Sequence, residues 1–217
     1  MLERSQVTGL LLCGGASRRM GKDKALLPAL QVPAGLGPAR DLLGRSAGLL
    51  AERCGRVLLA TGSGARYSDR GLEVVLDRAA GLGPLAGLEA GLRAATTPWV
   101  LAIPCDLPLL DLPALDGLLQ AAADGDLPAG VASDLRPDIW HWHGGDQLQP
   151  LCCLVRAACA DAAGLALDRG RRRVIAFWDE PTEGRPLRVH GLSPSESVRK
   201  SLWNVNTAAE WTAARSG

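Results

Sequence analysis

Short apolar runs alternate with helical patterns along the first half of the chain, and this alternation limits the fold more than any other feature. Four runs have the length and composition of buried strands, at residues 7–13, 56–61, 73–77 and 99–103. Two segments between them repeat apolar side chains at helical spacing, at residues 39–54 and 84–95. Strands that alternate with helices predict an α/β fold, with a mostly parallel sheet covered by helices on both faces.

The pattern is looser in the second half of the chain. Asp111 is placed to cap a helix that has Pro113 in its first turn and four apolar side chains on one face, Leu115, Leu118, Leu119 and Ala122. The segments "GVASD" and "LCCLV" are candidate strands, "AACADAAGLAL" is a candidate helix, and "TAAEWTAA" is a candidate C-terminal helix capped by Thr207. The Pro- and Gly-rich segment 28–38 is predicted to be an exposed spacer loop rather than a lid.

Composition excludes several classes of partner. A net charge of +1 over 217 residues gives no general attraction to nucleic acid or to an acidic membrane, and aromatic residues make up only 4%. No apolar window reaches the roughly 18 residues of a membrane span, and the N-terminal segment does not resemble a secretory signal. The six cysteines form no CxxC pair. We therefore expect a cytoplasmic protein with neither nucleic acid nor membrane as a partner.

The stretch "LLLCGGASRRMGKDKALLP" (10–28) predicts a polyphosphate site. It leaves the carboxyl end of a predicted strand, which is where open α/β sheets bind ligands. Gly14 and Gly15 allow close approach of backbone N–H groups to an anion, and four cations follow, Arg18, Arg19, Lys22 and Lys24. The two best-known phosphate signatures are both absent, because Ala16 stands where each needs glycine.

The loop resembles the L-x-G-G-x-S-x-R-M-G-x-D-K-x-L signature of the nucleotidyltransferases that make molybdopterin guanine dinucleotide. Ten positions match: Leu12, Gly14, Gly15, Ser17, Arg19, Met20, Gly21, Asp23, Lys24 and Leu26. Later segments are also similar to this family, at "LGPLAGLEAGL", "IPCDLPLL", "LQPLCCLV", "RRRVIAF" and "WNVNTAAE". The chain departs from the family in its 28–38 loop, at Ala60, where relatives often carry Asn, and at Ala208, where they usually carry Pro.

The resemblance implies a Rossmann-like sheet of the nucleotide-diphospho-sugar transferase type in one domain over residues 1–217. Residues 1–110 would mainly bind the nucleotide and residues 111–217 mainly the acceptor. The implied reaction transfers GMP from GTP to the terminal phosphate of molybdopterin and releases pyrophosphate. No strong base is needed, because the second pKa of a phosphate monoester is about 6. Proteins that deliver the pterin and receive the finished cofactor are implied as partners.

The resemblance also assigns roles to individual residues. Asp106 follows a buried strand and can bind Mg²⁺ together with phosphate oxygens and water, the alternative being a turn aspartate. Lys24 is expected to act on the phosphates, with help from Arg19. The implied nucleotide contacts are Leu12, Cys13, Gly14, Gly15, Lys24, Asp77, Gly83, Pro84, Leu85, Gly87 and Asp106.

The implied acceptor contacts are Arg172, Arg173, Asn204 and Asn206. Two alternatives remain for these residues. The arginines could be the solvated start of a helix. Either asparagine could instead complete the metal shell, as a late asparagine does in sugar-nucleotide relatives.

The sequence argues against two other functions and one other site. The cytidylyl enzyme of the same superfamily is disfavoured by "LCGG" and by G-P-L-A-G, and a GTP-binding adaptor without catalysis is disfavoured by the intact Lys24 and Asp106. "WHWH" (140–143) places His141 and His143 on one face of a strand, but without a third ligand it predicts an exposed hairpin and not a metal site. Cys152 and Cys153 are expected to be packing residues.

Overall fold

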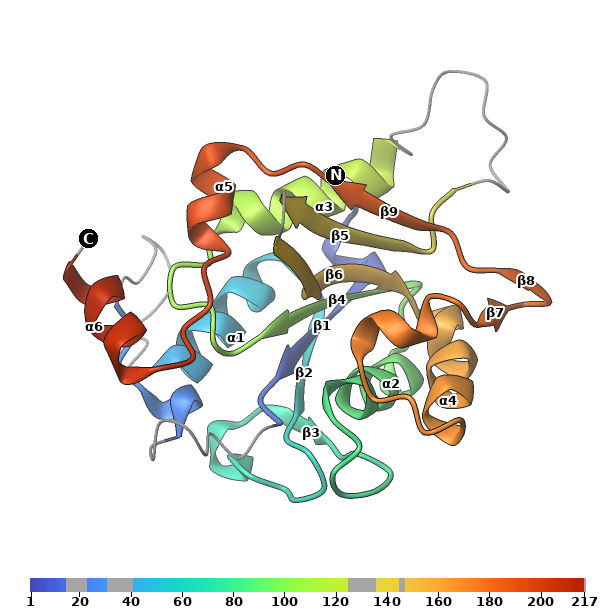
Figure 1. The fold of residues 1–217 in the computed structure, drawn as a ribbon, viewed down its shortest axis with the longest axis horizontal. Coiled ribbons are helices and arrows are strands. Elements are labelled where there is room, and N and C mark those ends of the chain that lie inside the picture. Colours follow the sequence, from blue (N-terminus) through green and yellow to red (C-terminus); the bar gives the residue numbers. More distant parts are fainter. Residues whose placement is uncertain (15–22, 31–40, 125–135, 145–146, 217) are drawn as a thin grey trace.

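A computed structural model describes residues 1–14, 23–30, 41–124, 136–144 and 147–216 of the chain (Figure 1). In this part of the chain seven strands form one sheet in the order β3-β2-β1-β4-β6-β5-β9. Their bounds are β1 Val7–Leu12, β2 Arg56–Ala60, β3 Glu73–Val75, β4 Trp99–Pro104, β5 Ile139–Gly144, β6 Gln147–Arg156 and β9 Val189–Leu192. Only β6 runs against the others, because it pairs antiparallel with both β4 and β5 while the remaining pairs are parallel.

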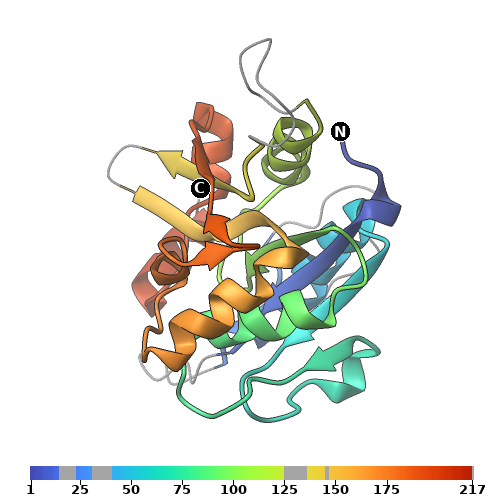
Figure 2. The same ribbon diagram turned by 90° about the vertical axis from the view of Figure 1, so that its right-hand side faces the viewer.

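Helices cover both faces of this sheet. Their bounds are α1 Leu42–Arg53, α2 Pro84–Ala94, α3 Leu112–Asp124, α4 Ala160–Asp168, α5 Glu196–Ser201 and α6 Ala208–Ser216. Side chains of α1, α3 and α5 pack on one face, and side chains of α2 and α4, which lie side by side in Figure 2, pack on the other. Successive residues of β1 serve the two cores, since Leu11 contacts the first and Leu10 and Leu12 contact the second.

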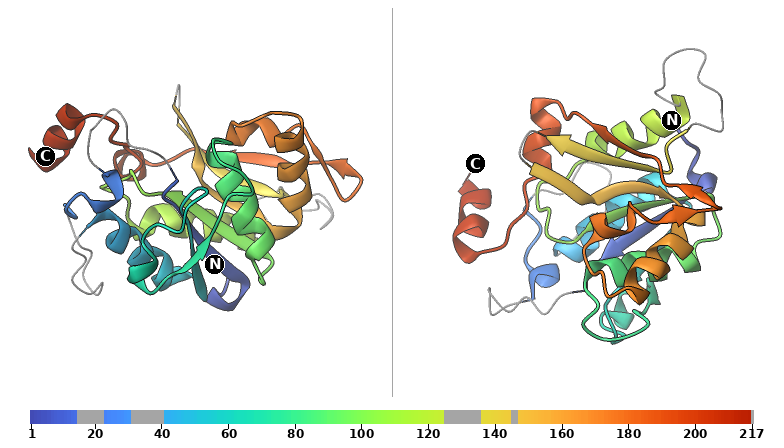
Figure 3. Two further views of the ribbon diagram at one scale, coloured as in Figure 1. Left: turned by 90° about the horizontal axis from the view of Figure 1, so that it is seen from below. Right: turned by 45° about the vertical axis from the view of Figure 1, so that its right-hand side comes forward.

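Shorter elements complete the chain. Five 3-10 turns are described, η1 Arg4–Gln6, η2 Lys24–Leu26, η3 Ser68–Arg70, η5 Ala157–Cys159 and η6 Val174–Phe177. A small hairpin pairs β7 Pro181–Thr182 with β8 Arg185–Pro186, and it lies at the opposite end of the molecule from α6 (Figure 3). None of the helices within the described ranges is long and apolar enough to cross a membrane.

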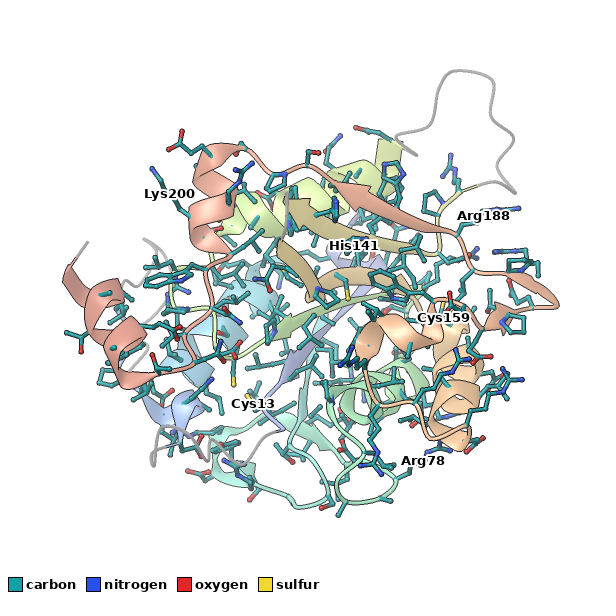
Figure 4. All side chains as sticks on the ribbon, in the orientation of Figure 1. Cys13, Arg78, His141, Cys159, Arg188 and Lys200 are labelled. Carbon is teal, nitrogen blue, oxygen red and sulfur yellow. The ribbon has the colours of Figure 1, made fainter. Side chains whose placement is uncertain are left out.

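The register of the parallel strands determines where the site forms. Leu12 lies level with Ala60 of β2 and with Pro104 of β4, so the loops that follow these three strands start side by side at one edge of the sheet. Cys13, labelled in Figure 4, is the first residue beyond β1 at this edge. Open α/β sheets bind ligands at the carboxyl ends of such strands.

The elements predicted for the first half of the chain are confirmed. Helix α1 begins at Leu42 because Asp41 caps it, its Oδ1 accepting from the Gly44 N–H at 2.9 Å. Asp111 caps α3 as predicted, accepting from the Ala114 N–H at 3.2 Å. "LCCLV" lies within β6, "AACADAAGLAL" forms η5 and α4, and Thr207 caps α6. "GVASD" and most of the 28–38 loop lie outside the described residues.

The prediction of an exposed hairpin at 140–143 is confirmed in its pairing, since β5 is antiparallel to the next strand β6, but it is wrong about exposure. Strand β5 lies between β6 and β9, and Trp140, His141 and Trp142 are all buried. The His141 ring stacks on Trp178, with ring centroids 4.8 Å apart, and burial lowers the pKa of His141. His141 and His143 do share a face, but no group of three metal-ligating side chains occurs in the described parts of the chain. Cys152 and Cys153 are buried packing residues, as predicted.

Candidate nucleotide-binding site

A cleft of about 630 Å³ opens at the carboxyl ends of β1, β2 and β4. Nine of the residues assigned to nucleotide or metal from the sequence line it: Leu12, Cys13, Gly14, Lys24, Asp77, Gly83, Pro84, Gly87 and Asp106. These residues come from four separate parts of the chain. The fold therefore brings the matched motifs together around one cavity that has the volume of a small-molecule site.

Lys24, Asp106 and Asn206 meet at this edge of the sheet. The Lys24 Nζ donates to Asn206 Oδ1 at 2.9 Å and lies 3.6 Å from Asp106 Oδ2. Lys24 is held by a turn that Asp23 caps, because Asp23 Oδ1 accepts from the Ala25 N–H at 3.2 Å. Lys24 and Asn206 are 182 positions apart in the sequence.

The segment that carries Asn206 is fixed on both sides. The Val205 N–H donates to the backbone carbonyl of Asp106 at 3.0 Å. On the other side, Glu210 Oε2 accepts from the N–H groups of Asn206 and Thr207, while Thr207 Oγ1 accepts from the Glu210 N–H. This reciprocal cap begins α6 at the residue that follows Thr207. Asn204 lies half-buried two residues before Asn206.

The surroundings of Asp106 favour a bound cation. Burial raises the pKa of the Asp106 carboxyl, and the charge of Lys24 opposes this increase only in part. A second cation near the carboxylate would stabilise its ionised form. Asp106 and Asn206 offer oxygen donors, and Mg²⁺ takes one or two carboxylates with phosphate oxygens and water. The donor set therefore fits Mg²⁺.

The opposite wall of the cleft is the start of α2. Gly83 caps this helix with φ +78°, a conformation that favours glycine, and Pro84 is its first residue. A Cβ on Gly87 would lie 3.2 Å from Leu12 Cδ2 and 3.3 Å from Ala60 Cβ. Glycine at this position thus keeps α2 close to the ends of β1 and β2.

Asp77 lines the cleft and carries an acceptor that has no hydrogen bond in the described part of the chain. Its Oδ1 is buried and accepts no hydrogen bond within the described part of the chain, although its N–H donates to the Gly62 carbonyl at 2.9 Å. Burial, and secondly the charge of Glu89, raise the pKa of the Asp77 carboxyl. Buried acceptors are usually paired, so this oxygen is suited to a donor group on a ligand.

Cys13 is not a nucleophile in this arrangement. A hydrogen bond between the thiols of Cys13 and Cys105 raises the pKa of Cys13, and burial raises it further. Only the thiolate is reactive, and Cys13 is 4% exposed. The side chain therefore forms part of the cleft floor.

The other residues assigned from the sequence either do not line the cleft or lie outside the described residues. Leu85 is fully buried in the core between α2 and the sheet, so its side chain does not line the cleft. Arg172 and Arg173 are exposed, and the Arg172 carbonyl lies against Gly83, 3.1 Å from where a Cβ would stand. The arginine pair therefore borders the wall formed by α2, whereas Asn206 lies beside Lys24. Gly15 and Arg19 lie outside the described residues.

One part of the cleft was missed from the sequence. The loop after β2 contributes Thr61, Ser63, Gly64 and Arg66, and Thr61 Oγ1 donates to the Gly64 carbonyl at 2.6 Å. The available signal was "TGSGAR", a glycine-rich stretch directly after a predicted parallel strand. Such a stretch starts at the same edge of the sheet as the matched loop and is a candidate for the same site.

A mostly parallel sheet with a lysine, a partly buried carboxylate and glycine-rich loops at one carboxyl edge is typical of a nucleotide-binding α/β protein. Residues 9–183 match the family model described as a MobA-like NTP transferase domain. The chain belongs to this family, which confirms the family and the fold class predicted from the sequence.

Named relatives agree with this assignment. The chain is 36% identical over 180 residues to the molybdenum cofactor guanylyltransferase of Ralstonia nicotianae, an alignment that covers 82% of this chain and 84% of that protein. The protein of the same name from Cupriavidus metallidurans is 35% identical over 177 residues, covering 80% and 81% respectively. The structure of molybdopterin-guanine dinucleotide biosynthesis protein A from Archaeoglobus fulgidus superposes with a TM-score of 0.70 at 18% identity, over 96% of this chain and 97% of that one, and this likeness shows the shared fold.

Proposed function

We propose that this chain transfers GMP from GTP to the terminal phosphate of molybdopterin and releases pyrophosphate. The observation that carries the proposal is the meeting of Lys24, Asp106 and Asn206 at the mouth of a nucleotide-sized cleft, in a member of this family. The names of the relatives at 36% and 35% identity support guanine as the base and molybdopterin as the acceptor.

Positioning and charge neutralisation account for the chemistry. The acceptor phosphate is ionised at neutral pH, so it can attack the α-phosphorus of GTP without a protein base. Lys24 would face the phosphates and stabilise the negative charge that grows as pyrophosphate leaves. Its hydrogen bond to Asn206 and its ion pair with Asp106 orient the ammonium before substrate binds. Arg19, on the same loop, would assist.

Asp106 and Asn206 are the residues that would hold Mg²⁺ in this cleft. Both present oxygen atoms near Lys24, and the burial of Asp106 favours a cation beside it. When bound, the ion supplies charge neutralisation at the departing pyrophosphate. In this assignment Asn206 would act with Lys24 and Asp106 near the phosphates of the nucleotide. Asn204 remains a candidate contact for the acceptor.

The wall formed by Gly83, Pro84 and Gly87 would receive the guanosine, with the Asp77 carboxyl accepting from a donor on the nucleotide. Asp77 Oδ1 is buried and unsatisfied within the described chain, which supports this role. Arg172 and Arg173 would hold the phosphate of the pterin, a role that is supported by their exposure and by the contact of Arg172 with Gly83. We thus retain a division in which residues 1–110 mainly bind nucleotide and residues 111–217 mainly bind acceptor, with Asn206 joining the two. Cofactor-delivery proteins and acceptor molybdoenzymes would be the protein partners.

The experiment that tests the proposal offers one base at a time. Purified protein is incubated with Mg²⁺, molybdopterin and either GTP, CTP or ATP, and the dinucleotide and pyrophosphate are quantified. We expect turnover with GTP at a kcat/KM far above the values for CTP and ATP. Equal turnover with CTP would contradict the guanylyl assignment and leave nucleotidyl transfer intact. Tight GTP binding with no pyrophosphate released would identify a binding protein without catalysis.

A further inference from the structure

Arg66 lies in the loop after β2 and lines the cleft together with Lys24. These two residues are the cations among the described residues that line it. Each is paired with a carboxylate, Lys24 with Asp106 Oδ2 at 3.6 Å and Arg66 with Asp23 Oδ2. The side chain of Arg66 is 39% exposed, which leaves it accessible to a ligand.

Residues of two segments hold the Arg66 guanidinium in place. Its Nη2 donates to Asp23 Oδ2 and to the Tyr67 hydroxyl, and the Tyr67 hydroxyl donates to the same Asp23 oxygen at 2.5 Å. The guanidinium carbon lies 4.8 Å from the centre of the Tyr67 ring. Asp23 also caps the turn that carries Lys24, so one carboxylate fixes both cations of the cleft.

The backbone at Tyr67 indicates that this arrangement is imposed by its surroundings. Tyr67 has φ 60° and ψ 26°, the left-handed region that residues other than glycine rarely adopt. Such a conformation costs about 1–2 kcal/mol and persists where neighbouring contacts stabilise it. The turn at Tyr67 brings its ring against the guanidinium and its hydroxyl onto Asp23.

We propose that Arg66 is a second phosphate-binding residue, which contacts the β- or γ-phosphate of the bound nucleoside triphosphate. This inference rests on the proposed function, because it assumes a nucleotide in the cleft. A triphosphate carries several negative charges, more than one lysine can compensate. A guanidinium matches phosphate oxygens through paired N–H donors, and its orientation by Asp23 and Tyr67 reduces the entropy lost on binding.

The test compares nucleotides that differ only in their phosphates. The dissociation constants of GMP, GDP and GTP are measured by calorimetry, with Mg²⁺ present, for the wild-type protein and for Arg66→Ala. We expect GTP and GDP to bind about 10- to 100-fold more weakly to the variant, because charge-assisted hydrogen bonds to phosphate are lost, and GMP to bind unchanged. Arg66→Gln, which is polar but uncharged, should behave in the same way and serves if the alanine variant does not fold.

Arg70→Ala is the matched control. Arg70 lies four residues further along the same segment, but its guanidinium pairs with Asp41 at 2.7 Å and does not line the cleft. We expect this variant to bind all three nucleotides as the wild-type protein does.

Three results would count against the inference in distinguishable ways. Wild-type affinity of an Arg66 variant for GTP would overturn it, and so would equal weakening of GMP, GDP and GTP, which would assign Arg66 to the shape of the cleft. Failure of the wild-type protein to bind any guanine nucleotide would overturn the proposed function, and this inference with it.

Discussion

The environment of Asp106 disfavours the ionised carboxylate that its proposed role in binding Mg²⁺ requires. The Asp106 side chain is 26% exposed beside Lys24, and the partial burial raises the pKa of the carboxyl. A partly buried carboxylate that is compensated only in part costs free energy in the folded protein. A function that requires its negative charge explains why the chain has this residue here.

Asp106→Asn should abolish transfer without unfolding the protein. Asparagine keeps the size and one oxygen but removes the charge that would fix Mg²⁺ relative to the attacking phosphate. Because the folded protein disfavours ionisation of Asp106, its free energy of unfolding should change by no more than about 1 kcal/mol. Pyrophosphate release and thermal unfolding measure the two effects. Near-normal activity in a folded variant would show that the metal binds elsewhere.

The sequence predicted which residues line the cleft better than it predicted which of them contact one another. Lys24, Asp106 and Gly83 were found because each stands in a motif that continues a strand or opens a helix. Arg66 was missed because it belongs to no matched motif, and its role depends on a contact with Asp23, 43 positions away. The placement of Asn206 beside Lys24 is equally a product of tertiary structure.

At the level of elements, hydrophobic periodicity was most informative where strands and helices alternate. Helices α1, α2 and α3 each have one apolar face and were predicted. Strand β5 alternates Trp and His at residues 140–143, a pattern that predicts one exposed face, but Trp140 packs into one core while His141 on the other face is buried by stacking on Trp178. Strand β9 and helix α5 were missed because they are only four and six residues long.

Close contact between α2 and β1 depends on Gly91. A Cβ at this position would lie 2.3 Å from Leu10 Cδ2 and 2.6 Å from Leu10 Cδ1, both in a fully buried side chain. Gly91→Ala should therefore lower the free energy of unfolding by about 1–3 kcal/mol, despite the higher helix propensity of alanine. Chemical denaturation measures the change.

Gly64→Ala is the control for this substitution. A Cβ on Gly64 would have no neighbour within 4 Å, so the free energy of unfolding should change by less than about 0.5 kcal/mol. If Gly91→Ala is as stable as this control, α2 can move away from the sheet and the close contact is not required.

The whole molecule is organised so that distant parts of the chain complete one edge of the sheet. The final segment passes Asp106, places Asn206 on Lys24 and ends in α6, which packs on Leu42 through Trp211 and Ala214. Figure 3 shows α6 at one end of the molecule and the β7–β8 hairpin at the other. No local pattern in the sequence could predict these contacts, because each joins segments that are far apart along the chain.

The far end of the sheet is joined to the rest by Asp138, a buried carboxylate just before β5. It accepts from Arg185 Nη1 at 2.7 Å, from Arg185 Nη2 at 2.8 Å and from the Arg188 N–H at 3.0 Å. Arg156, at the end of β6, lies 3.7 Å away. Burial by itself would raise the pKa of Asp138, but these hydrogen bonds and charges outweigh it and hold the pKa below its ordinary value of 3.8.

Asp138→Asn should therefore destabilise the protein in a pH-dependent way. A carboxyl whose pKa is lower in the folded state stabilises the fold above its unfolded pKa, and this stabilisation is lost as the pH falls through the folded value. At pH 7 the variant should lose about 2–4 kcal/mol, since Arg185 loses its ionised partner and is itself partly exposed. Below about pH 4 the difference from the wild-type protein should shrink, because Asp138 then binds a proton in the unfolded chain and, at still lower pH, in the folded protein as well.

Urea unfolding at pH 7, 4 and 3 measures this difference, with Asp179→Asn as the control. Asp179 is 82% exposed and lies 3.8 Å from Arg171, so its replacement should change the free energy of unfolding by less than about 0.5 kcal/mol at each pH. A deficit in Asp138→Asn that stays constant down to pH 3 would mean that the geometry of the hydrogen bonds, and not the charge, holds β5 to the segment around Arg185. If the loss in free energy of unfolding becomes smaller as the pH falls, the negative charge of Asp138 is what holds β5 to the segment around Arg185.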